Sequence, residues 1–228
     1  MAYTKTIVCF ANSRKLNGRC VAGREWDGRN FGAWIRPISS ATKGELYGER
    51  YYANNKDPEL LDVIEIPFLK PQPSTYQSEN HLVDANRRWC RAGTLKLDQI
   101  INAVETIRGA LWVNGSSTGN GKNDKVAQEA VIKLPNSLVL IQPKQLVMTI
   151  DTEGVAFGNA KRRVRGSFGL NGQHYVFAVT DPRVETELRK QEDGSTRDLT
   201  NPILCISLSE IFEKQHASFK LIAGVIET

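Results

Sequence analysis

Short apolar runs separated by Gly, Pro, Asn and Asp dominate the chain. This pattern is typical of β-strands joined by turns, whereas long amphipathic helices require apolar residues at spacings of three and four. The predicted strands span residues 5–11, 19–25, 32–38, 62–69, 137–143, 146–151, 161–168, 174–180, 203–208 and 219–226. We therefore predict an all-β fold, rich in strands and with few short helices.

The best helical spacing lies in residues 95–107, where Leu97, Ile100, Ile101 and Val104 recur three and four positions apart. Residues 184–192 are a weaker helical candidate, and residues 57–62 could supply one helical turn. None of these segments is long enough to cover a sheet in an α/β layer fold.

A polar segment near the midpoint suggests a division into two halves. Residues 114–125, NGSSTGNGKNDK, contain Gly, Asn and Ser and almost no apolar side chain, which is typical of an exposed flexible loop. We place the boundary near residue 135, giving domains of residues 1–135 and 136–228. Each half then holds about five short strands, which favours two small OB-like Greek-key barrels packed in one chain.

Composition narrows the class of protein. The 228 residues are 40% hydrophobic and 24% charged, as in ordinary globular proteins, and 30 Lys and Arg against 25 Asp and Glu give a formal charge of +5. This mild excess is compatible with a polyanionic partner. The N-terminal residues lack the apolar stretch of a signal peptide and no run of about 18 apolar residues occurs, so we expect a cytoplasmic protein with no membrane partner.

Known cofactor motifs are missing from the sequence. The four cysteines include no C-x-x-C pair, so we expect free thiols and no structural metal. Neither G-x-x-x-x-G-K-[ST] nor H-E-x-x-H occurs. We expect no cofactor.

The Asn171-Gly172 pair between two apolar runs predicts a two-residue type I′ hairpin turn, because both central residues must adopt positive φ. Such a turn fixes the register of the two strands. The pairs placed on one face, which we predict to be the core face, are Phe168 with Tyr175, Gly166 with Phe177, and Val164 with Val179.

The opposite face of this hairpin carries a basic row formed by Lys161, Arg163 and Arg165. Arg162 falls on the core side, at a register position where we expect an ion pair with Asp181. Cations on alternate residues of a strand are about 6 to 7 Å apart, which matches successive phosphates of an extended single strand. The alternative is that these cations form a solvated face or discourage edge-to-edge aggregation.

A second group of cations lies near the N-terminus. Arg14 and Lys15 belong to a polar loop, and Arg19 and Arg36 flank a turn around Asp27-Gly28. A two-residue turn would place Arg19 opposite Arg36, a repulsive pair that a phosphate, an acid or a different register would relieve.

Two tryptophans are candidates for base stacking. Trp34 lies beside this basic group, and Trp112 precedes the polar loop of residues 114–125. Stacking on an aromatic side chain contributes about 1 to 3 kcal/mol per base. The competing interpretation, which composition favours, is that both rings pack in the core.

The best position for chemistry is YQSENHLVD, residues 76–84, where Glu79 and His81 are the catalytic candidates. A carboxylate and an imidazole can transfer protons. A lone histidine among polar neighbours is more often a hydrogen-bonded loop residue, so both interpretations stay open.

Several strings in order along the chain resemble the bacterial dual OB-containing domain family. They are IVCFANSRKLNGRCVAGRE, WIRPIS, DVIEIPF, QSENHL, LWVNGSS, FGNAKRRVR, VTDP and LCISLSE, between about Ile7 and Val225. The resemblance implies two OB folds in one chain. OB folds often bind single strands on one barrel face, but they also bind proteins and sugars.

Three functional hypotheses follow. The leading one is a non-enzymatic nucleic-acid-binding module, accessory to a bacterial defence or nucleic-acid-processing assembly. The accessory role in such an assembly rests on the family resemblance alone. Its candidate contacts are Arg14, Lys15, Arg19, Arg36, Lys161, Arg163, Arg165, Trp34 and Trp112. The alternatives are a scaffold that recruits a protein partner and an enzyme that processes nucleic acid or nucleotides through Glu79 and His81.

Overall fold

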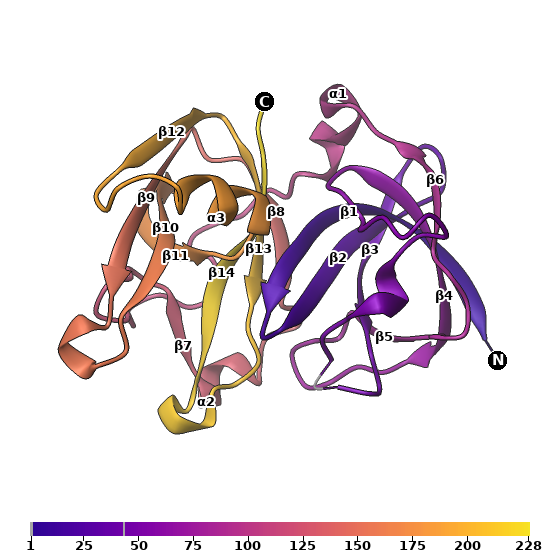
Figure 1. The fold of residues 1–228 in the computed structure, drawn as a ribbon, viewed down its shortest axis with the longest axis horizontal. Coiled ribbons are helices and arrows are strands. Elements are labelled where there is room, and N and C mark those ends of the chain that lie inside the picture. Colours follow the sequence, from indigo (N-terminus) through magenta and orange to yellow (C-terminus); the bar gives the residue numbers. More distant parts are fainter. Residues whose placement is uncertain (1, 43) are drawn as a thin grey trace. The chain divides into compact units, whose positions relative to one another are not determined.

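The computed structural model describes residues 2–42 and 44–228 and is all-β, with 49% strand and 12% helix (Figure 1). All ten predicted strands are present. Four further strands, β5, β6, β7 and β12, are only three to five residues long, and their polar or short sequences gave no alternating signal.

Contacts divide the chain into two compact units. Unit 1 comprises Met1–Val104 and Pro135–Ser137, and unit 2 comprises Glu105–Leu134 and Leu138–Thr228. The segment Glu105–Leu134, which the sequence placed at the end of the first domain, therefore belongs to unit 2.

Unit 1 is a closed five-stranded barrel with one added strand. Its strands are β1 (Tyr3–Lys15), β2 (Gly18–Trp26), β3 (Phe31–Ile38), β4 (Asp62–Pro71), β5 (Asn80–Val83) and β6 (Cys90–Thr94). The order is β1-β2-β3-β5-β4 and back to β1, with β3 and β5 parallel, while β6 pairs with β4. Such a closed small barrel leaves few unpaired strand edges.

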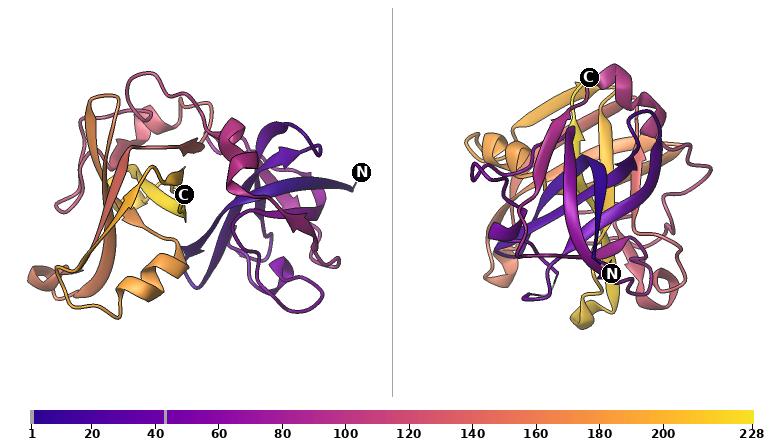
Figure 2. Two further views of the ribbon diagram at one scale, coloured as in Figure 1. Left: turned by 90° about the horizontal axis from the view of Figure 1, so that it is seen from above. Right: turned by 90° about the vertical axis from the view of Figure 1, so that its right-hand side faces the viewer.

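The long strand β1 closes this barrel by pairing on both sides. Its residues 3–8 pair with β4 and its residues 7–15 pair with β2, with an irregularity between Cys9 and Ala11 (Figures 1 and 2). β1 and β2 approach so closely that a Cβ on Gly23 would lie 2.2 Å from the Val8 carbonyl oxygen. Glycine is thus required at position 23.

Unit 2 repeats the strand order of unit 1. Its strands are β7 (Lys125–Ala127), β8 (Leu138–Ile141), β9 (Gln145–Glu153), β10 (Lys161–Leu170), β11 (Gln173–Val179), β12 (Thr196–Thr200), β13 (Ile203–Leu208) and β14 (Ala217–Ile226). The order β9-β10-β11-β14-β13 matches β1-β2-β3-β5-β4, and β11 and β14 are parallel as β3 and β5 are. β12 and β8 extend the two ends of this sheet, and β7 pairs with β14.

The helices are short. They are α1 (Leu97–Ile100), α2 (Gln128–Val131), α3 (Pro182–Leu188), and the 3-10 helices η1 (Gly48–Arg50), η2 (Ile101–Ala103), η3 (Val155–Phe157) and η4 (Glu213–Gln215). The predicted helix at 95–107 is thus reduced to α1 and η2, and residues 57–61 form a turn into β4.

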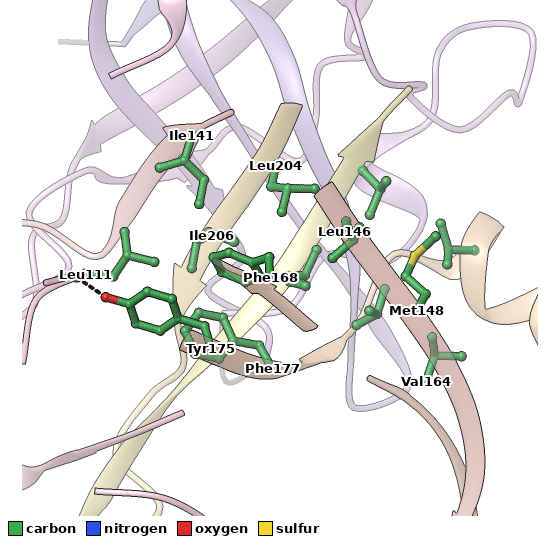
Figure 3. Packing of buried hydrophobic residues seen from close by; sticks show 14 of the residues in the cluster. Leu111, Ile141, Leu146, Met148, Val164, Phe168, Tyr175, Phe177, Leu204 and Ile206 are labelled. Carbon is green, nitrogen blue, oxygen red and sulfur yellow. Dashed lines mark hydrogen bonds between the residues drawn. The ribbon is translucent and has the colours of Figure 1, made fainter. Parts of the chain in front are cut away.

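Apolar side chains from β8 to β14 fill the core of unit 2 (Figure 3). The rings of Phe168, Tyr175 and Phe177 contact one another with centroids 5.3 to 5.4 Å apart. The Tyr175 hydroxyl lies at the margin of the apolar cluster, where it accepts a hydrogen bond from the Leu111 backbone N–H. The core face predicted for the hairpin is therefore confirmed, with Val164 and Val179 also buried.

Candidate nucleic-acid interface

The β10–β11 hairpin has the predicted type I′ turn. Asn171 and Gly172 adopt φ values of 52° and 72°. The register pairs Phe168 with Tyr175. Because side chains alternate along a strand, this register places Lys161, Arg163 and Arg165 on the face opposite the core.

β10 is an inner strand of the sheet, so a role in discouraging edge-to-edge aggregation is wrong, while the solvated face stays the alternative prediction. It pairs with β11 on one side and with β9 on the other. The β9 register places Glu153 opposite Lys161 and Asp151 opposite Arg163. Cross-strand neighbours of opposite charge interact favourably, so the basic row lies against an acidic one.

Arg165 is held by two carboxylates. Its guanidinium donates to both oxygens of Glu153, with Nη2 3.1 Å from Oε2, and Nη1 lies 3.4 Å from Asp124 Oδ2. Burial raises the pKa of Glu153, but the hydrogen bonds and charge of Arg165, with Asn120 and Arg163, lower it below its ordinary value. Arg165 is only 16% exposed and is fixed in orientation.

Arg163 and Lys161 are the accessible cations of this row. The Arg163 side chain is 48% exposed, and its Nε lies 3.6 Å from Glu153 Oε2, beyond hydrogen-bond distance. Lys161 is exposed at the start of β10. Both can reach an anion without breaking a buried contact.

A groove of about 490 Å³ lies beside Arg163 and Arg165 over β9, β10 and β11. Its lining residues include Thr149, Asp151, Glu153, Arg163, Arg165 and Ser167. The Ser167 hydroxyl lies 2.9 Å from His174 Nε2. Hydroxyl, guanidinium and carboxylate groups make the groove polar, with charges of both signs.

The polar segment 114–125 borders this face and is well anchored, contrary to the flexible loop expected from composition. Lys122 forms a β-bridge with Val176 of β11, and Asn123 Nδ2 donates to the His174 carbonyl oxygen. Asp124 accepts hydrogen bonds from the backbone N–H and hydroxyl of Thr118. The small polar side chains that suggested a linker instead bond the segment to itself and to β11.

Arg162 is structural, as predicted, but its expected ion pair with Asp181 is wrong. Its Nε lies 2.9 Å from Asp193, and its other nitrogens donate to the carbonyls of Arg189 and Gln191 beyond α3. Asp181 instead caps the N-terminus of α3. A capping carboxylate satisfies backbone donors that a helix leaves unpaired, which accounts for its different partner.

The two sheets share one strand order, and a comparison with protein families identifies the fold they belong to. The model of the dual OB-containing domain matches residues 5–225, nearly the whole chain. The chain belongs to this family. A comparison with curated proteins found no match. Membership of an OB-containing family indicates a binding module and names no ligand.

In the first OB unit, Arg36 is buried and ion-paired with Glu79. Arg36 Nη2 lies 3.2 Å from Glu79 Oε1, and the two side chains are 4% and 3% exposed. Glu79 also accepts a hydrogen bond from the Ser137 hydroxyl. This ion pair is buried, and we assign it a structural role in the barrel.

The two-residue turn that would have set Arg19 opposite Arg36 is not formed. The connection from β2 to β3 has four residues, 27–30, so that Trp26 pairs with Phe31. Arg19 instead pairs in register with Arg14 of β1, and its Nε lies 3.9 Å from an Asp57 oxygen. Lys15 ends β1 and is half-buried.

Both candidate stacking tryptophans are half-buried within their own OB units. The Trp34 ring lies 6.0 Å from that of Phe10 in an edge arrangement. Trp112 packs against the core of unit 2 and has a positive φ of 56°. These positions favour the core interpretation for the two rings.

The two catalytic candidates have separate partners. Glu79 pairs with Arg36, while His81 Nδ1 shares a hydrogen bond with the Tyr3 hydroxyl. Burial and the nearby Lys5 lower the pKa of His81, although Glu25 opposes this effect. The neutral imidazole is therefore favoured, which suits a buried hydrogen-bonded residue. Within the described residues, His, Cys, Asp and Glu side chains form no group of three that could hold a metal ion.

Sequence reasoning missed Lys220, a buried lysine on β14. It is 1% exposed, and its Nζ donates to the Val113 carbonyl and to Asn114 Oδ1 at 2.7 and 2.9 Å. The ammonium also lies 5.6 Å from the centre of the Tyr175 ring. Burial lowers the pKa of Lys220 to about 7, although the charge of Asp124 opposes this effect. The alternation in FKLIAGVI gave no sign that its lysine lies inside.

Among the helices that the structure describes, none is both long and apolar enough to cross a bilayer.

Proposed function

We propose that this dual OB protein binds single-stranded nucleic acid along the outer face of β9, β10 and β11. The observation that carries the proposal is the pair of accessible cations on β10, Lys161 and Arg163, of which Arg163 lines a polar groove on this face. Alternate positions on β10 space them by about 6 to 7 Å, close to successive phosphates. The formal charge of +5 favours a polyanion.

Nearby acids limit the strength of this interaction. Arg165 is already neutralised by Glu153 and Asp124, so it orients the groove and adds little net attraction for phosphate. Two phosphate contacts remain, from Lys161 and Arg163. For a single strand, affinity then falls with salt at a log–log slope of about 1.4, at about 0.7 per contact.

Fluorescence anisotropy with labelled 12-nucleotide DNA and RNA, measured across a salt series, tests the proposal. Lys161→Ala/Arg163→Ala should abolish most of the salt dependence and weaken binding about tenfold or more at low salt. The control Lys144→Ala/Lys214→Ala removes the same charge from exposed positions of unit 2 that do not line the groove. Equal effects of the two double variants, or no binding by wild type, would refute the proposal.

Glu153→Gln provides a test in the opposite direction. Removing this carboxylate releases the charge of Arg165 and ends the competition for Arg163. Affinity should rise and the salt slope should increase by up to about 0.7. A protein-recruiting scaffold would instead show no response to Glu153→Gln in nucleic-acid binding.

A further inference from the structure

Unit 1 contains a cavity of about 640 Å³ between the segment 52–62 and the start of β6. Its lining residues include Tyr52, Lys56, Glu59, Arg88, Trp89 and Arg91. Pockets for small molecules commonly have volumes of about 300 to 1,000 Å³. The cavity is therefore large enough for a small organic ligand.

Trp89 lies at the inner wall of this cavity. It lines the cavity but is only 1% exposed, and a parallel β-bridge holds it beside Tyr52. Within the described chain, its indole Nε1 is buried and has no hydrogen-bond partner. This N–H is not open to the cavity, so Trp89 can report on a ligand there but does not donate to it.

The buried carboxylate of the cavity has both of its oxygens engaged. Asp62 Oδ2 accepts from the Tyr52 hydroxyl at 2.8 Å and from the Glu59 backbone N–H at 3.1 Å. Asp62 Oδ1 accepts from the Arg91 Nε and the Thr94 hydroxyl. Its negative charge is therefore balanced inside the protein.

Asp57, the second cavity carboxylate, is occupied in the same way. Arg50 donates Nε to Oδ1 and Nη2 to Oδ2, both at 2.7 Å. Asn12 Nδ2 donates to Oδ1 as well. Arg50 does not line the cavity. Its positive charge therefore offsets the negative charge of Asp57 without occupying space in the cavity.

Among the lining side chains other than Asp57 and Asp62 and their partners, hydrogen-bond donors outnumber acceptors. Lys56 is exposed, and Arg88 donates Nη1 to the Gly48 carbonyl at 3.1 Å, while its guanidinium has further N–H groups. Glu59 is the remaining carboxylate of the lining. A ligand that complements this cavity has to bring acceptor oxygens and negative charge.

We infer that this cavity binds a small molecule through a phosphate or carboxylate group, with Lys56 and Arg88 as its charged donors and the Trp89 ring in the wall beside them. The inference is independent of nucleic-acid binding at the β9–β11 face, because different residues carry it.

Indole N–H signals in a ¹H–¹⁵N spectrum test the site directly, since the chain has four tryptophans. Trp89→Phe assigns one signal, and if that variant fails to fold, the three other Trp→Phe variants assign it by elimination. At constant ionic strength, inorganic phosphate, acetate and adenosine monophosphate are titrated separately. We expect a saturable shift of the Trp89 signal.

The three probes distinguish the source of the oxyanion. Saturation by phosphate or by the nucleotide identifies a phosphate group, and saturation by acetate alone identifies a carboxylate. Lys56→Ala/Arg88→Ala should weaken binding about tenfold, as expected for lost charge-assisted hydrogen bonds. Arg87→Ala is the matched control, because Arg87 is exposed and adjacent but does not line the cavity.

Two results would overturn the inference. One is a Trp89 signal that none of the probes shifts saturably, and the other is a dissociation constant that Lys56→Ala/Arg88→Ala leaves unchanged. Lys161→Ala/Arg163→Ala should leave the titration unaffected, so failure of nucleic-acid binding and failure of this site give different results.

Discussion

The buried ammonium of Lys220 should make the stability of the protein depend on pH near neutrality. The pKa of Lys220 is about 7 in the folded protein, whereas the ordinary value for lysine is 10.5. Between pH 7 and pH 10.5, Lys220 is therefore charged in the unfolded chain but neutral in the folded protein. The unfolded chain then binds more protons. The free energy of unfolding must therefore rise with pH in this window, and the cost of the buried charge is fully present below pH 7.

The size of this effect follows from the difference in pKa. Stability changes by at most about 1.4 kcal/mol for each pH unit, and the whole difference corresponds to an energy on the order of 5 kcal/mol. Between pH 7 and 9 we expect a rise of about 2 to 3 kcal/mol. Asp124 is the charged group that raises the pKa of Lys220.

Lys220→Met isolates the effect because methionine has a similar length and no charge. Urea unfolding of wild type and variant is followed at intervals from pH 7 to 9. The difference between their free energies should grow with pH in favour of wild type, since other titrating groups cancel. The absolute offset is less informative, because the variant also leaves the Val113 carbonyl and Asn114 Oδ1 without their donor.

A matched control is Lys214→Met, which removes an exposed lysine of the same unit. Its difference from wild type should be constant across the range. A constant difference for Lys220→Met as well, within about 0.5 kcal/mol, would show that Lys220 remains protonated in the folded protein and would refute the reasoning.

Three further substitutions test contacts within each unit, and their effect on the free energy of unfolding is measured by urea unfolding. Arg36→Ala leaves the Glu79 carboxylate buried without its cation and should cost about 3 to 5 kcal/mol. Gly23→Ala forces a methyl group against the Val8 carbonyl and should cost about 3 kcal/mol. Gly172→Ala places a side chain at a φ of 72° in the type I′ turn and should cost about 1 kcal/mol.

Each of these variants has a control in the same unit. Arg29→Ala removes an exposed arginine, Gly93→Ala adds a methyl group with nothing within 4 Å, and Gly169→Ala alters β10 without a positive φ. The three controls should change stability by less than about 0.5 kcal/mol. Equal losses in a variant and its control would contradict the contact assigned to that position.

Local sequence predicted the parts of the fold that depend on local chemistry. Asn171-Gly172 set a turn type, the turn set a register, and the register placed Phe168 in the core and Arg163 outside. Every step follows from residues close together in the chain. The ten strands that the sequence predicted formed for the same reason.

Contacts between distant segments could not be predicted in this way. Glu153 neutralises Arg165 because β9 pairs with β10, and Asp124 joins them from a segment whose composition resembled a linker. The Asp27–Asn30 connection was misjudged because Asp27 bonds the N–H groups of Arg29 and Asn30, which stabilises a four-residue loop. The family resemblance predicted two OB units, and the sequence of β12 alone gave no strand signal.

The path of the chain between the units has a consequence for the order in which the protein can fold during synthesis. Ser137 donates to Glu79, and the Pro135 carbonyl accepts from the Ser78 hydroxyl, so the first barrel uses residues that follow Glu105–Leu134. On the ribosome, this barrel receives its last contacts only after a segment of the second unit has emerged. A fragment ending at Val104 would lack those contacts, and one ending at Ser137 would carry Leu111 and Val131 without the strands that bury them.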